Sequence, residues 1–324
     1  MLNIVKAQWP ALVALAGLVC WTSLAVAQEE TEGGEVRSAQ TTVTVDESKC
    51  CPLGRALSFD ITYTLVSDYV WRGFNLSEYA TEGREKPNHQ LEVAANVDLG
   101  QLWGQDPGTC GTLTMGTWFE WFGAQHELDP DKGAHNCQEI DYDLSWAYDI
   151  ADLATEFTLG YVFWTFPNAK IANTQEWYFS LEHNDAWMWD WLWPGNEEGI
   201  LNPTFTFYED VALGAGKAMW MEVGLSHEFE ICPKLAVTPS WTLGIDHNYH
   251  HYFAGEPEST TRLATMVWGL DATYDITELV RFPEDVGSVS LSGFLQFSDA
   301  LGNPEDDGII QDEFYGGMSV GFSF

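Results

Sequence analysis

The chain has 324 residues and a large excess of acid, with 49 Asp and Glu against 13 Lys and Arg and a formal net charge of −36. This charge argues against nucleic acid as a partner, because a phosphate backbone needs a positive binding surface. The 16 Trp, 18 Phe and 12 Tyr are typical of membrane β-barrels, which carry aromatic girdles at both bilayer interfaces. The composition alone also allows an acidic soluble β domain.

The first 27 residues have the pattern of a secretory signal peptide. Lys6 is their only charge, residues 11–19 form an apolar core, and Ala25 and Ala27 provide small residues for cleavage after Ala27. The apolar run is shorter than the roughly 20 residues of a spanning helix. We therefore expect an exported protein that crosses any membrane with strands. Residues 28–55 are rich in Glu, Thr, Ser and Gly, which predicts a poorly ordered periplasmic tail.

From residue 56 onward, segments with alternating polar and apolar residues are separated by turn residues. We place twelve strands near residues 56–70, 88–99, 111–123, 138–150, 155–165, 175–183, 201–209, 217–231, 234–247, 262–276, 287–299 and 312–324. This predicts an all-β fold, an antiparallel up-and-down transmembrane β-barrel of about twelve strands over residues 56–324. An even count places both chain ends on the periplasmic side.

The connectors support this topology with one exception. Long polar segments near residues 72–87, 124–137, 248–261 and 300–311 are predicted to be outer loops, and residues 151–154 and 232–233 to be short periplasmic turns. The link after the sixth strand should also be short, but it carries Trp187, Trp189, Trp191 and Trp193. We interpret it as a periplasmic interfacial anchor, either strand or short helix.

The last segment, residues 314–324, alternates apolar and small residues and ends on Phe324. A free edge strand of this kind would promote aggregation in a soluble protein, whereas in a closed barrel it pairs with the first strand and contacts outer-membrane lipid. A terminal Phe also resembles the signal that the barrel-assembly machinery recognises in bacterial outer-membrane proteins.

One face of the predicted strands is strongly acidic. With the apolar residues facing outward, the lumen face carries Asp60, Glu92, Glu120, Asp141, Asp143, Asp149, Glu176, Glu182, Glu222 and Asp271. We expect no Lys or Arg on that face within the strands, and the densest acid cluster at Glu120, Asp141 and Asp143. Carboxylates in a narrow lumen concentrate cations and repel anions. The pattern therefore predicts a passive channel for small hydrophilic solutes or cations.

Four short motifs resemble the TorF-type family of outer-membrane porins. They are Asp68, Tyr69, Trp71, Arg72 and Gly73 within the segment Ser67–Gly73, then Thr174–Tyr178, Asn202–Thr204 and Glu222–His227. The resemblance covers about residues 56–324 and implies a barrel of this size with a channel role. The chain departs from the family pattern in its Trp-rich link and its cysteines, and no catalytic residue carries over.

Asp68 and Arg72 share a face of an extended strand about 13 Å apart, too far for a direct pair. Arg72 lies near the predicted outer mouth, so it pairs either with a lumen carboxylate or in a salt bridge at the rim.

Other polar groups provide weaker signals for chemistry. His247, His250 and His251 could bind a transition metal, but they fall in a predicted outer loop, where polar residues are solvated. The acidic turn at residues 303–308 falls in another predicted outer loop. Ser226 and His227 are adjacent, so their side chains point to opposite faces of a strand and cannot form a nucleophile–base pair. We predict neither an enzyme nor a cofactor. A non-conducting barrel used as a structural or interaction platform is the second hypothesis, and an outer-membrane hydrolase the third.

Overall fold

A computed structural model describes residues 55–77, 86–123, 137–168, 172–192, 194, 199–212, 217–254, 261–283, 285–302 and 310–324. All of them belong to one compact unit, residues 51–324. The predicted signal peptide, almost all of the predicted tail and the acidic turn at residues 303–308 lie outside this part of the chain. In the ranges given above, no helix has the length and apolar character needed to cross a membrane.

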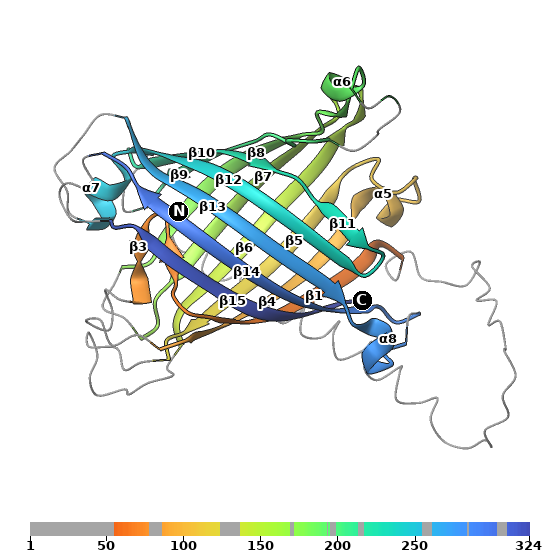
Figure 1. The fold of residues 1–324 in the computed structure, drawn as a ribbon, viewed down its shortest axis with the longest axis horizontal. Coiled ribbons are helices and arrows are strands. Elements are labelled where there is room, and N and C mark those ends of the chain that lie inside the picture. The colour runs from red at the N-terminus through yellow and green to blue at the C-terminus, as the bar shows by residue number, and fades with distance from the viewer. Residues whose placement is uncertain are drawn as a thin grey trace, which may run out of the picture. The chain divides into compact units, whose positions relative to one another are not determined.

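The fold is a closed antiparallel β-barrel, as predicted (Figure 1). Thirteen strand segments form one sheet, and β10 and β11 both pair with β12 as two pieces of one strand, which leaves twelve. The segments are β1 (Leu57–Val66), β4 (Asn88–Asp98), β5 (Thr112–Trp121), β6 (Cys137–Ile150), β7 (Thr155–Thr165), β8 (Thr174–His183), β9 (Thr204–Asp210), β10 (Met219–Ser226), β11 (Phe229–Cys232), β12 (Leu235–His247), β13 (Arg262–Asp275), β14 (Ser288–Ala300) and β15 (Glu313–Ser323).

The barrel closes where the last strand pairs with the first. β1 and β15 are antiparallel from Asp60 opposite Ser323 to Val66 opposite Gly317. Phe324 extends the pairing, since its amide donates to the carbonyl of Phe59 at 2.9 Å and its ring lies 5.6 Å from that of Phe59. The C-terminal strand is therefore an integral part of the wall.

The two faces of the sheet have opposite chemistry. The apolar face points outward and leaves large side chains exposed on many strands, among them Leu65, Leu144, Leu159, Trp177, Trp268, Leu295 and Met318. The strand register keeps these residues on one face around the sheet. The other face carries mainly small, polar and acidic residues, so the alternation read from the sequence separates outside from lumen.

The two ends of the barrel differ in their connectors (Figure 1). One end carries the short helices α5 (Leu99–Leu102), α6 (Ala186–Trp189) and α8 (Thr277–Val280), and the 3₁₀ turn η2 (Ala151–Leu153). The other end carries the hairpin β2 (Val70–Trp71) and β3 (Phe74–Asn75), and α7 (Tyr249–Ala254). The connectors that were expected to be short lie at the end that carries η2, and α5, α6 and α8 each lengthen one of them, so the expectation of a single exception is wrong.

The Trp-rich link forms the short helix α6 around a buried carboxylate. Asp185, 1% exposed, accepts hydrogen bonds from Trp189 Nε1 at 2.8 Å and from the amide of Ile200 at 2.7 Å. Trp187 and Trp191 remain 68% and 77% exposed, while Trp193 lies outside the described residues. In the described part of the link, Trp187 lies in α6 and Trp191 in the turn after it, and both indoles are exposed at the barrel end.

Candidate functional site

The inward face gathers the acids that the sequence pattern selects. The register places all ten predicted carboxylates on the face opposite the apolar one: Asp60, Glu92, Glu120, Asp141, Asp143, Asp149, Glu176, Glu182, Glu222 and Asp271. They do not form one site. Several of them fall into three groups, which are a ladder at the end that carries η2, a buried cluster on β5 and β6, and a group around Arg72; Asp60, Glu92, Asp143 and Asp271 lie outside these groups.

The ladder consists of directly paired acids on three neighbouring strands. Asp149 lies opposite Glu156, and Glu156 lies opposite Glu182. These three residues, together with Glu228 and Glu230, line a cavity of about 710 Å³. Five carboxyl groups therefore surround the space at this end of the barrel.

The buried cluster differs from the predicted one. Glu120 lies opposite Glu139 on β6, and the two are 0% and 6% exposed. Asp141 follows two residues along the same face, whereas Asp143 lies further on and accepts from Tyr178 Oη at 3.1 Å. Glu139 thus takes the place predicted for Asp143. Glu139 has the same two-residue spacing on β6 as Asp141 and Asp143, and this spacing could have identified it from the sequence.

This cluster is covered by Tyr69, which precedes the hairpin. The Tyr69 ring lies 5.2 Å from that of Trp118, and its hydroxyl contacts Glu139 Oε1 at 3.4 Å. Burial, and then the negative charge of Glu139 and Asp141, raises the pKa of Tyr69 well above its usual value. The hydroxyl therefore stays protonated and donates toward the acids.

The β2–β3 hairpin turns tightly at Arg72 and Gly73. Both have positive φ, 50° and 87°, as the two central residues of a type I′ turn require. A Cβ on Gly73 would lie 2.7 Å from Thr265 Cγ2 of β13, so the turn needs glycine for space as well as for its backbone. Asn75 Nδ2 reaches Glu313 of β15 at 3.2 Å. The hairpin therefore contacts β8, β13 and β15, and Tyr69 just before it contacts β5 and β6. These strands are spread around the barrel, so the hairpin crosses the lumen.

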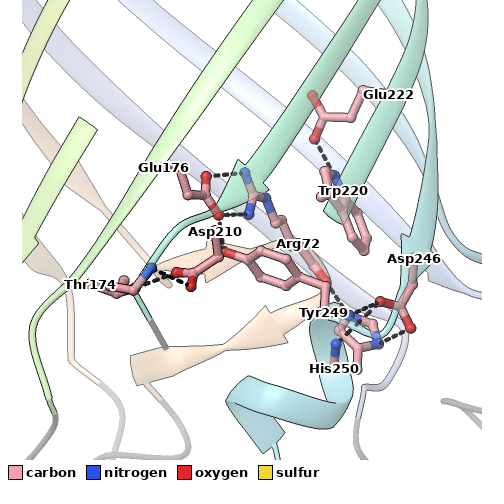
Figure 2. Close-up of polar contacts among 10 residues, drawn as sticks. Arg72, Thr174, Glu176, Asp210, Trp220, Glu222, Asp246, Tyr249 and His250 are labelled. Carbon is pink, nitrogen blue, oxygen red and sulfur yellow. Dashed lines mark hydrogen bonds and ion pairs between the residues drawn. The ribbon is translucent and has the colours of Figure 1, made fainter. Parts of the chain in front are cut away.

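Arg72 forms a bidentate ion pair inside the barrel (Figure 2). Its two terminal nitrogens lie 2.8 and 2.9 Å from the two carboxylate oxygens of Glu176 on β8, and the side chains are 6% and 0% exposed. Of the two alternatives left open by the sequence, the structure shows a lumen partner. Asp68 does not take part, and its carboxylate accepts from Asn75 at 3.4 Å.

Aromatic rings enclose the same guanidinium. We call these five rings, together with Glu176, the Arg72 cage. The distances from Arg72 Cζ to the ring centroids are 4.3 Å for Tyr208 and Tyr249, 5.0 Å for Trp71, 5.7 Å for Trp220 and 5.8 Å for Trp164. All lie within the range of cation–π attraction. Burial lowers the pKa of Arg72, but the charge of Glu176 outweighs it and the net shift is upward. The guanidinium therefore remains a cation.

Residues of α7 hold the cage from the loop side. Tyr249 Oη donates to Glu176 Oε1 at 2.5 Å, and His250 Nε2 lies 3.3 Å from the carbonyl of Arg72. Asp246, near the end of β12, accepts hydrogen bonds from the amide of Tyr249 at the start of α7, at 2.6 Å, and from Arg262 Nε at 2.9 Å. Figure 2 shows Tyr249, His250 and Asp246 near Arg72 and Glu176.

The expectation that no Lys or Arg lies on the lumen face within the strands is wrong, because Arg262 of β13 lies on that face opposite Asp246. The register slips between Gly244 and Ile245 of β12, so that Thr265 and Leu263 are their partners and Ala264 is the extra residue. This bulge turns Arg262 toward Asp246, on the inward face. A strict two-residue period could not show it.

The three histidines with metal-binding potential do not converge. His250 is fully buried beside Phe74, with rings 4.7 Å apart, whereas His247 contacts Thr261 Oγ1 and the ring of His251 lies edge to face with that of Tyr252. Across the described ranges, no group of three His, Cys, Asp or Glu side chains could hold a metal ion.

Ser226 and His227 are also separate. Ser226 lies opposite Ser240 in the sheet, while His227 Nδ1 is 3.0 Å from the carbonyl of Gly199 and its ring packs on Phe229. The pair has no nucleophile–base geometry.

No protein-family model matches the chain, and no curated protein matches it. Among solved structures, it is similar to the NanC porin, with 11% identity and a TM-score of 0.41 over 82% of this chain and 98% of the other. An outer membrane channel from Pseudomonas putida F1 has 9% identity and a TM-score of 0.43, over 85% of this chain and 97% of the other. Outer membrane phospholipase A from Escherichia coli has 13% identity and a TM-score of 0.39, over 82% of this chain and 89% of the other. These likenesses are too distant to carry an argument about function, and membership of the TorF-type family stays a prediction.

Proposed function

We propose that this protein is a cation-selective channel of the bacterial outer membrane whose lumen is obstructed by the β2–β3 hairpin. The predicted signal peptide supports export, and the pairing of β15 with β1 closes the barrel wall. Apart from β9 and the split strand, the strands have 10 to 14 residues, enough for the roughly 9–11 that cross a bilayer. The exposed apolar face then contacts outer-membrane lipid.

The observation that carries the cation preference is the imbalance of charge on the inward face. Ten predicted carboxylates and Glu139, Glu156, Asp210 and Asp246 share this face, against Arg262 and the hairpin's Arg72 among the described residues. Low-dielectric walls focus the resulting negative potential, and eight strands leave an interior that side chains fill whereas 16 to 18 leave an open channel. A twelve-stranded lumen is intermediate, so permeating ions pass close to the carboxylates.

The hairpin favours one alternative, a non-conducting barrel that serves as a structural or interaction platform. It crosses the lumen and is tied to the wall by a buried ion pair, which is compatible with a permanently closed barrel. The separation of Ser226 from His227 gives no support to the third hypothesis, an outer-membrane hydrolase.

Single-channel recording in a planar lipid bilayer separates the first two hypotheses. Wild type should show small or infrequent conductance steps, and Arg72→Ala should show larger or more frequent ones, because the hairpin loses its buried ion pair. Lys217→Ala is the matched control, since it removes an exposed cation just before β10, outside the cage. Silence of wild type and both variants would refute the channel, and turnover of lipid or peptide by the purified protein would revive the hydrolase.

A further inference from the structure

We propose that the barrel-wall part of the Arg72 cage is a binding site for organic cations of the guanidinium or ammonium type, and that Arg72 occupies it in cis. The inference rests on the proposed channel in one respect, since it names the class of solute that the lumen recognises. Binding itself can be tested without conductance.

The site is built into the wall and does not depend on the hairpin. Trp164, Glu176, Tyr208 and Trp220 come from β7, β8, β9 and β10, four strands that neighbour one another in the sheet. Tyr208 and Trp220 are directly opposite each other. Three aromatic faces and one carboxylate therefore stand together on a continuous piece of the barrel, and the hairpin adds only the cation and Trp71.

The wall needs a cation where the guanidinium lies. Glu176 is 0% exposed. Without Arg72 it would keep the neutral hydroxyl of Tyr249 as a donor but would have lost its counter-charge, and a buried carboxylate without a counter-charge is strongly unfavourable. If the hairpin withdraws, Glu176 loses both of its hydrogen bonds from Arg72 and the cage loses its centre. A free cation that fits the same space would restore these interactions.

The geometry selects organic cations over small inorganic ones. A guanidinium matches the two carboxylate oxygens with two parallel N–H groups, as the Arg72 distances of 2.8 and 2.9 Å show. Aromatic faces attract weakly hydrated cations that can give up water. A potassium ion has no N–H groups of its own to match the two carboxylate oxygens, and it must give up hydration water to contact the rings.

The hairpin and a free cation then compete for one site. Arg72 is tethered, so its effective concentration is on the order of millimolar or higher. A solute that displaces it binds the state in which the hairpin has left the wall and therefore shifts the population toward that state. Binding of the solute and clearance of the lumen are thus the same event.

Chemical rescue of an emptied cage tests the site. Methylguanidinium is titrated calorimetrically into detergent-solubilised full-length Arg72→Ala, with potassium at equal ionic strength as the reference cation. We expect one-to-one binding that is at least about tenfold tighter than to wild type, where Arg72 competes. Tetramethylammonium, which has no N–H donors, should bind more weakly than methylguanidinium.

Two further variants make the test specific. Arg72→Ala/Glu176→Gln should lose at least about tenfold in affinity because the carboxylate is gone, and Lys217→Ala should behave as wild type. If Arg72→Ala refolds poorly, methylguanidinium in the refolding buffer should raise the folded yield and potassium should not. Failure of methylguanidinium to bind the folded variant, or to raise the yield of a poorly folding one, would overturn the site. Binding without any conductance would instead contradict the channel and leave the site standing.

Discussion

At the scale of single residues, the function proposed here depends on Arg72 and on the glycine that follows it. Arg72 has a left-handed backbone conformation, which costs a residue with a Cβ some stability. The bidentate pair with Glu176 and the surrounding rings offset that cost. Gly73 is the residue that lets the turn approach Thr265, so it sets how deeply the guanidinium reaches into the wall.

Gly73→Ala should therefore disrupt the hairpin by two effects. Positive φ costs of order 1 kcal/mol for a residue with a Cβ, and the added methyl would lie 2.7 Å from Thr265 Cγ2. Gly104 has a similar φ of 73°, but it lies at the other end of the barrel and a Cβ at that position would have nothing within 4 Å, which makes Gly104→Ala the control for a substitution of the same kind that does not touch the hairpin. Amide hydrogen exchange over residues 69–75 should accelerate in Gly73→Ala and stay at the wild-type rate in Gly104→Ala. Equal rates in all three proteins would show that the close approach to Thr265 does not hold the hairpin.

Residue-level features were partly accessible from the sequence. The two-residue period places ten acids on one face, and the observed strand register keeps them there. Their part in an ion pathway stays a prediction. Arg262 escaped it because the bulge at Ala264 changes the period locally. The partners of Arg72 come from β7 to β10 and α7, and no spacing along the chain connects them, so only the fold could reveal the cage.

At the scale of elements, the strands follow the sequence pattern closely and the short helices do not. Each predicted strand corresponds to an observed one with ends shifted by a few residues, except that the predicted segment 217–231 is interrupted between β10 and β11. The helices α5, α6 and α8 have four residues each, which is too short for a helical period to appear. Their ends are fixed by local contacts such as Asp98 Oδ1 with the amide of Gln101 at 2.9 Å.

The outward face of β1 provides a test of the membrane assignment. Ile61 lies opposite Val93 and Phe322 on the apolar face, and Thr62 lies opposite Glu92 and Gly321 on the lumen face. Arg at the bilayer midplane of a barrel costs about 2–4 kcal/mol. Ile61→Arg should lower the folded fraction in lipid vesicles, measured by the shift of the unheated band on a gel, and Thr62→Arg should fold nearly as wild type. Equal folding of the two variants would contradict the membrane face.

We expect the stability of the α6 connector to depend on pH through the carboxylate of Asp185. Burial alone would raise the pKa of Asp185, but hydrogen bonds donated by Trp189 and by the amides of Leu201 and Ile200 outweigh it, and the pKa is lowered. A carboxylate with a lowered folded pKa contributes stability above its unfolded pKa, about 3.9, and loses it as pH falls through the folded value.

Asp185→Asn should consequently cost about 1–3 kcal/mol at pH 7, measured by urea unfolding in detergent. The gap between wild type and variant should shrink as pH falls below about 4. Asp152→Asn, an exposed carboxylate in the neighbouring η2 turn, is the control and should have little effect at either pH. A gap for Asp185→Asn that is constant with pH would mean that its charge does not stabilise the turn.

At the scale of the whole molecule, the barrel combines an acidic lumen with a cationic hairpin that neutralises part of it. The ladder of Asp149, Glu156 and Glu182 and the cavity beside it leave one end rich in negative charge. Towards the other end, Arg72 and Arg262 each pair with a buried acid, Glu176 and Asp246. In the proposed function, this negative charge attracts cations into the lumen and the hairpin determines whether they pass.

The reversal potential across a planar bilayer with a potassium chloride gradient tests this account most directly. We expect wild type, and more clearly the Arg72→Ala variant, to reverse on the cation side, and simultaneous replacement of Glu120, Asp141 and Asp143 by Lys to move the reversal potential toward the anion side. A reversal potential on the anion side for the unaltered lumen, or one that persists on the cation side after the triple replacement, would contradict it.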